Sequence, residues 1–115
     1  METRCALCDA EMETTKHVLL ECHFARMVWA LAHIPWDVVN GWTGDAAGWF
    51  SRVLCRLRQE GTPHFLMLGW ALWRNRNRKR MEGVTWEPLR VVNDALLLLV
   101  QYQDARTKLR LGIIR

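Results

Sequence analysis

Three cysteines and one histidine near the start of the chain have the spacing of a zinc site. Cys5 and Cys8 are separated by two residues, so a tight turn can present both sulfur atoms to one ion. His17 and Cys22 lie five positions apart, a little over one helical turn. Three thiolates and one imidazole form the closed shell of a structural zinc ion, which leaves no position for a substrate. His23 is the competing ligand, and it faces away if Cys22 faces the metal.

The Cys5–Cys8 pair could bind zinc, form a disulfide or act as a redox-active dithiol. The cellular compartment helps to decide among these three roles. The N-terminus has no apolar signal segment, and no segment reaches about 18 consecutive apolar residues. We therefore expect an intracellular protein, nuclear or cytoplasmic, with no membrane partner and with reduced thiols. Thioredoxin-like chemistry would also need a βαβ setting, which the sequence does not indicate.

A second candidate site is the basic run between residues 74 and 80. Its five cations are Arg74, Arg76, Arg78, Lys79 and Arg80. They could hold a phosphate backbone, with Trp70 or Trp73 nearby for base stacking. The alternatives are a helix C-terminus, which favours cations through its dipole, and a nuclear-localisation signal. At about 100° per residue, the charges spread around a helix instead of forming one face.

The composition is that of one ordinary globular domain. The chain has 115 residues, of which 50% are hydrophobic and 24% are charged, so a disordered chain and a large enzyme are both excluded. Residues 1–60 carry six Lys or Arg and eight Asp or Glu, whereas residues 61–115 carry ten and four. No nucleophile–base pair or open metal site is apparent in the sequence. We therefore expect no enzymatic activity and no small-molecule substrate.

The elements that position these residues are predicted to be helices. Apolar residues recur at intervals of three and four, and no stretch alternates with a period of two. The helices are expected over residues 14–33, 45–60, 63–81 and 85–111. This pattern predicts an all-α fold with about four helices in a bundle and an N-terminal Cys-Cys-His-Cys zinc knuckle. Residues 1–115 are expected to form a single domain, with the knuckle and first helix in residues 1–33 and the helical bundle in residues 45–111.

Two further expectations concern where the large apolar side chains lie. Residues 95–100 are apolar around the whole helix circumference, which predicts that the last helix is central. Trp29, Trp49 and Trp73 fall on apolar helix faces and are expected in the core. Trp36 and Trp42 fall in a predicted turn and are candidates for an exposed contact surface.

Residues 5–29 resemble the zinc-binding domain that follows reverse transcriptase in plant non-LTR (LINE-type) retrotransposons. The matching positions are Cys5, Cys8, Glu13, Thr14, His17, Cys22, Ala25, Val28 and Trp29. Residues 70–83 resemble a W-x-x-W-x-x-R-N segment found downstream in the same elements, before the ribonuclease H domain. Ala6, Asp9 and His23 depart from the family pattern, which usually has Pro, Gly and Pro there. A polymerase or ribonuclease H core would not fit, so the resemblance implies a short stand-alone protein derived from a retrotransposon.

Three functional hypotheses follow from these features. The first is a non-enzymatic zinc-binding helical module that binds RNA or DNA through the basic helix. The second is a protein–protein interaction module, an adaptor or inhibitor of a host protein, in which zinc is purely structural. The third is an expressed relic without a selected activity. Binding that weakens with salt would favour the first hypothesis, whereas a large contiguous apolar patch on the folded surface would favour the second.

Overall fold

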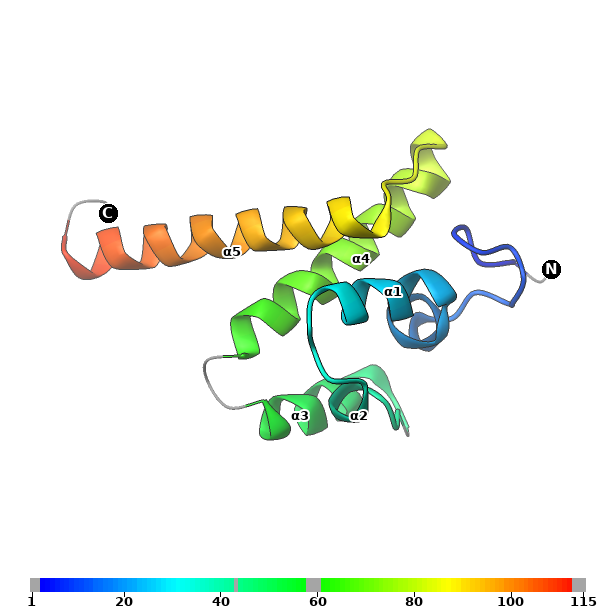
Figure 1. Cartoon of the computed structure of the whole chain (residues 1–115), viewed down its shortest axis with the longest axis horizontal. Helices are drawn as coiled ribbons and strands as arrows, with labels where there is room; N and C mark the ends of the chain where they lie inside the picture. The colour runs from blue at the N-terminus through cyan, green and yellow to red at the C-terminus, as the bar shows by residue number, and fades with distance from the viewer. Residues whose placement is uncertain (1–2, 43, 58–60, 113–115) are drawn as a thin grey trace.

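The computed structural model describes residues 3–42, 44–57 and 61–112 (Figure 1). Its helices are η1 (His17–Glu21), α1 (His23–Leu31), α2 (Trp36–Val39), α3 (Ala46–Arg56), α4 (Thr62–Glu82) and α5 (Pro88–Arg110). The described residues contain no strand, only an isolated bridge between Arg4 and Met12, and this confirms the all-α prediction. None of the described helices combines the length and hydropathy needed to cross a membrane. The single-domain assignment for residues 1–115 stays a prediction.

The helix predicted over residues 14–33 is divided in two at Cys22. This residue has φ −59° and ψ 135°, an extended conformation between η1 and α1. Its backbone N–H donates to the His17 carbonyl at 2.7 Å, five residues back, which gives η1 a wide π turn. In a continuous α-helix the two side chains would point about 140° apart. The wide turn and the break therefore allow His17 and Cys22 to reach the same ion.

Stacked aromatic rings form the centre of the core. Trp29 of α1 stacks on Phe65 of α4 with ring centroids 5.4 Å apart, and Trp49 of α3 meets both rings edge-on. The indole N–H groups of Trp29 and Trp49 donate to backbone carbonyl groups, so both side chains are buried with their polar atoms satisfied. Trp42 stacks on Trp49 at 4.6 Å and is only 8% exposed, so the expectation of a surface role for Trp42 is wrong. Trp36 is 39% exposed.

The prediction that the last helix is central is wrong. Only the first turns of α5 are buried, through Val91, Val92 and Ala95, which pack toward α1 and α4. Leu97 is 56% exposed and Val100 is 60% exposed. Figure 1 shows the C-terminal half of α5 extending beyond α4. The apolar block is therefore covered on one side only, because the neighbouring helices lie on one side of α5.

The turn between α4 and α5 is fixed by a buried asparagine. Asn75 of α4 has no exposed surface, and its Oδ1 accepts from the backbone N–H of Trp86 at 3.0 Å and from Arg78 at 3.1 Å. Gly83 ends α4 in the left-handed conformation at φ 74°, where a glycine has no steric penalty. These contacts set the direction in which α5 leaves α4.

Candidate metal centre

The N-terminal loop is shaped to present two sulfur atoms. The backbone N–H of Cys5 donates to the Glu11 carbonyl at 2.8 Å, and that of Asp9 donates to the Cys5 carbonyl at 2.9 Å. The Leu7 N–H lies 3.4 Å from the Cys5 sulfur. Asp9 has φ 55°, at a position where the resembled family usually has glycine. Aspartate tolerates this left-handed conformation, so the loop keeps its turn and Cys8 faces Cys5.

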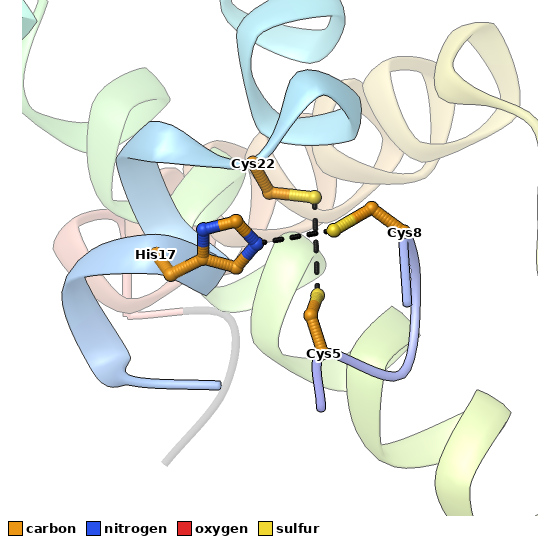
Figure 2. Close-up of side chains that lie close together, drawn as sticks. All are labelled: Cys5, Cys8, His17 and Cys22. Atoms are coloured by element: carbon orange, nitrogen blue, oxygen red, sulfur yellow. Dashed lines mark hydrogen bonds between the residues drawn. The ribbon is translucent and has the colours of Figure 1, made fainter. Parts of the chain in front are cut away.

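The four predicted ligands converge on one point (Figure 2). Their ligand atoms all lie within 4.8 Å of one another. Cys8 Sγ is 3.2 Å from His17 Nε2, and Cys5 Sγ is 3.9 Å from Cys22 Sγ. Cys5, His17 and Cys22 are buried, and Cys8 is partly buried. His23 is exposed and lies outside this cluster, so it is not the fourth ligand.

Both the donor set and the spacing fit zinc. A tetrahedral zinc ion with ligands at 2.0 to 2.3 Å needs ligand atoms about 3.3 to 3.8 Å apart. The separations of 3.2 Å and 3.9 Å lie close to that interval. Three sulfur atoms and one imidazole nitrogen are the donors of closed structural sites. Cys5, Cys8, His17 and Cys22 therefore form a zinc-ligand group.

Burial and mutual repulsion oppose the ionisation of all three thiols together at this site. Burial, together with the negative charges of Cys5 and Cys8, raises the pKa of the Cys22 thiol to about 12. Burial also raises the pKa of Cys8, but hydrogen bonds from the Ala10 backbone and from His17 outweigh it and bring that pKa down to about 7. Three thiolates in one buried site repel each other, and a divalent ion offsets that repulsion.

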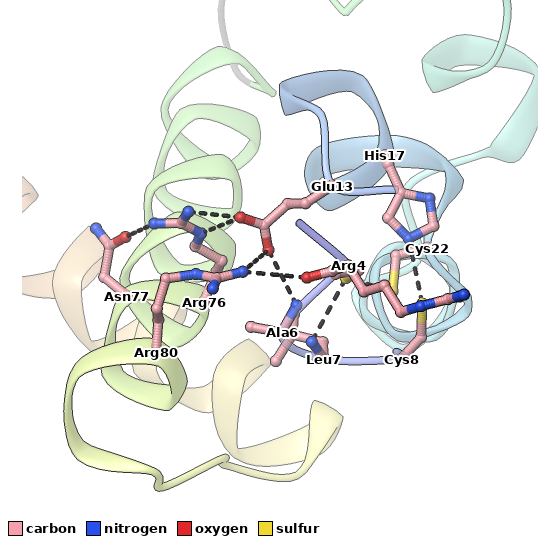
Figure 3. A network of polar contacts seen from close by, with 11 residues as sticks. Arg4, Ala6, Leu7, Cys8, Glu13, His17, Cys22, Arg76, Asn77 and Arg80 are labelled. Atoms are coloured by element: carbon pink, nitrogen blue, oxygen red, sulfur yellow. Dashed lines mark hydrogen bonds and ion pairs between the residues drawn. The ribbon is translucent and has the colours of Figure 1, made fainter. Parts of the chain in front are cut away.

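A buried glutamate fastens the zinc loop to α4 (Figure 3). Glu13 accepts hydrogen bonds from Arg76, with Nε at 2.9 Å, and forms an ion pair with Arg80 at 3.0 Å. It also accepts the backbone N–H of Ala6 at 3.0 Å, inside the loop between the first two cysteines. Arg80 donates in addition to the Arg4 carbonyl at 3.1 Å. One carboxylate thus joins the zinc loop to two turns of α4.

The charge of Glu13 is stabilised by these contacts. Its side chain is only 7% exposed, and burial alone would raise the pKa of its carboxyl group. The hydrogen bonds from Arg76, from the Ala6 backbone and from Arg80 outweigh burial and hold the pKa at about 2. The carboxylate is therefore ionised throughout the physiological range, as a buried ion pair requires.

The basic run does not form a single exposed positive face. Arg76 and Arg80 are directed to Glu13, and two of the remaining three cations also have partners within the chain. Arg74 forms an ion pair with Asp94 of α5 at 3.7 Å. The guanidinium of Arg78 lies over the ring of Trp86, 3.6 Å from its centroid. Lys79 is half-buried. The structure therefore assigns much of this charge to contacts within the chain.

The role of Glu13 was not predicted from the sequence, although the resemblance contained the signal for it. Glu13 belongs to the Glu-Thr pair of the first resembling segment, and Arg76 is the arginine of the second segment, residues 70–83. The ion pair between them joins the two segments in space. Thr14, the other member of the pair, accepts the backbone N–H of His17 at 3.0 Å and so orients a zinc ligand.

Residues 1–29 match the profile of a protein family described as zinc-binding in reverse transcriptase. The match confirms the family resemblance. All four zinc ligands lie inside the matched segment, together with Glu13, whereas residues 30–115 lie outside it. No curated protein and no solved structure matches the chain.

Proposed function

We propose that this chain is a non-enzymatic, zinc-stabilised helical module that binds another protein chain through α5. The zinc ion has a structural task in this proposal, because four protein ligands close its shell and leave no position for a substrate. The module would act by presenting a surface, because the thiol of Cys8 and the imidazole of His17, which lie in contact, both belong to the zinc-ligand group. The zinc loop and the Glu13 contacts hold α4, and α4 in turn positions α5.

The exposed apolar side of α5 carries the proposal. Four large apolar residues lie there, and we refer to them as the α5 stripe: Leu89, Leu96, Leu97 and Val100. They are 56%, 41%, 56% and 60% exposed. Large apolar side chains exposed along one side of a helix are a candidate protein-binding surface. The cations that favoured a nucleic-acid partner are, by contrast, largely engaged within the chain.

Site-specific photo-crosslinking tests the proposed function. A photoreactive phenylalanine analogue replaces Leu97 in one variant and Leu109 in a matched control, because both leucines lie on α5 and both are 56% exposed. We expect protein adducts, identified by mass spectrometry in cell extract, at position 97 and few at position 109. Adding Val100→Glu should abolish the adducts at position 97. Equal adducts at both positions, or none at position 97, would reject the proposal.

A nucleic-acid partner is the second candidate, and one face of α4 favours it. Trp70 is 54% exposed, and Arg74 and Arg78 follow it at intervals of four residues on the same side of the helix. Trp70 can stack on a base, and Arg74 and Arg78 can contact phosphates when they exchange their contacts with Asp94 and Trp86 for them. This face replaces the full set of five cations as the candidate contact surface.

Salt-dependent binding tests this second candidate. Changing Arg74 and Arg78 to Gln should reduce the salt dependence of binding to single-stranded RNA by about one unit of slope per lost phosphate contact. Changing Arg106 and Arg110 to Gln removes the same charge from α5 and is the matched control. Equal losses in the two double variants would indicate a non-specific effect of net charge.

A further inference from the structure

We infer that the partner of the α5 stripe is a second copy of this chain, docked with its α5 antiparallel and with Leu97 at the two-fold axis. This inference rests on the proposed function and names the occupant of the same surface. The stripe lies along one helix, so an antiparallel second copy can bring its own Leu96, Leu97 and Val100 against those of the first. A two-fold pair then buries the same residues on both copies.

The spacing of the exposed residues is that of a helix–helix seam. Leu89, Asn93, Leu96 and Val100 follow one another at intervals of four, three and four residues, and all four are exposed. An alternation of three and four is the period of coiled-coil contact positions, which keeps one side of a helix facing a partner. Leu97 lies beside this seam. An asparagine within the seam is tolerated there and restricts the pairing to one register.

The charges beside the seam select the antiparallel direction. Arg90 lies seven residues before Leu97 and Asp104 lies seven residues after it, so the three share one side of α5. A two-fold axis at Leu97 places Arg90 opposite the partner's Asp104, twice in the dimer. A parallel pair in the same register would place like charges opposite each other instead.

Both charged groups are available for such a contact. Asp104 forms a surface ion pair with Lys108 at 3.1 Å, and its side chain is 62% exposed. The guanidinium of Arg90 lies over Trp86, 4.0 Å from the ring centroid, and the residue is exposed. Neither contact removes the group from the surface. Each group can therefore gain a cross-chain ion pair while its contact within the chain persists or exchanges.

The shape of the molecule permits this pairing. The C-terminal half of α5 extends beyond α4 (Figure 1), so it is accessible to a second copy. In the antiparallel arrangement, each protruding half lies against the outer side of the other copy's first turns, where Leu89 and Asn93 are exposed. One helix pair buries less area than a standard interface of about 1,200–2,000 Å², so we expect a reversible dimer with a dissociation constant between about 1 µM and 1 mM.

Sedimentation velocity of the purified, zinc-loaded chain under reducing conditions tests the dimer. Between about 5 µM and 500 µM the weight-average mass should rise toward that of two chains. Leu97→Glu should lower the association constant by about tenfold or more. The change removes both leucines from the axis and brings two negative charges together there. Leu109→Glu is the matched control and should leave association unchanged. A chain that stays monomeric over this range, or equal losses in the two variants, would overturn the inference.

Charge reversal tests the direction of the pairing. Arg90→Glu and Asp104→Arg should each weaken the dimer, because each single change places like charges opposite one another. Combining them should restore association to near the wild-type value, since the opposite charges then face each other again. A double variant as weak as the sum of its parts would overturn the antiparallel register.

These outcomes separate the self-association from the proposed function. If the purified chain is monomeric but crosslinking at position 97 yields an identified adduct with a different protein, the proposed function stands and the second copy is rejected. If no adduct of either kind forms at position 97, both are rejected.

Discussion

Replacing Glu13 by Gln should destabilise the chain far more than any exposed glutamate would. The change keeps the size of the side chain but removes the charge that Arg76 and Arg80 contact. A fall in the carboxyl pKa from 4.5 to about 2 corresponds to about 3 kcal/mol of folding free energy. We therefore expect Glu13→Gln to lower the free energy of unfolding at pH 7 by about 2–3 kcal/mol.

Urea denaturation of the zinc-loaded protein measures this loss, with Glu11→Gln as the matched control. Glu11 lies two residues away in the same loop and is exposed, so its substitution should cost less than about 0.5 kcal/mol. The pKa of Glu13 is lower in the folded chain than in the unfolded chain, so its contribution is complete above about pH 4.5. The stability gap between wild type and Glu13→Gln should stay constant from pH 8 to 5 and should shrink as the pH falls toward 2.

A double-mutant cycle with Arg76→Gln decides whether the ion pair causes the effect. The two substitutions should be strongly non-additive, with a coupling energy of about 1–3 kcal/mol, because either one alone leaves a charge without its partner. The Glu13 carboxylate would not stabilise the attachment of the zinc loop to α4 if Glu13→Gln were as stable as Glu11→Gln. The same conclusion would follow if the effects of Glu13→Gln and Arg76→Gln were additive.

Three further outcomes test the metal site and the turn after α4. Purified protein should contain about one equivalent of zinc, which His17→Ala should largely lose and His23→Ala should retain, as measured by elemental analysis. Chelation should increase hydrogen exchange in residues 1–22 while most of the far-UV circular dichroism of α4 and α5 persists, and complete loss of helix would contradict this. Asn75→Ala should lower the free energy of unfolding by about 1–3 kcal/mol, since the partly buried N–H of Trp86 loses its acceptor; an unchanged denaturation midpoint would contradict this.

The zinc ligands were predictable because short spacings between rare residue types determine them. The Cys5–Cys8 interval allows only a tight loop, and that loop exists. The path between His17 and Cys22 was not predictable in the same way. Helical periodicity continues across both residues, so the pattern indicates one helix, whereas simultaneous access to a metal requires the break at Cys22. The geometry of the ligands overrides local helix propensity at this point.

The position of α5 shows a different limit of sequence patterns. The residues from 95 to 100 are apolar on every side, and burial of all of them is the simplest prediction. A hydrophobic pattern predicts that a helix face is buried. It does not predict whether the residues that bury this face belong to the same chain or to another one. The pairing of Glu13 with Arg76 was hidden for a related reason, since charge patterns are informative within one helix but not across 63 residues.

That separation of 63 residues between Glu13 and Arg76 has a consequence for the order in which the protein is made. During synthesis the zinc loop leaves the ribosome first, while the arginines that hold it have not yet been translated. The loop can bind its metal early, but it gains its attachment only after α4 has emerged and folded. In that interval the three thiols of Cys5, Cys8 and Cys22 depend on zinc alone for protection from oxidation. We therefore expect the supply of zinc to the nascent chain to affect how much protein reaches the final fold.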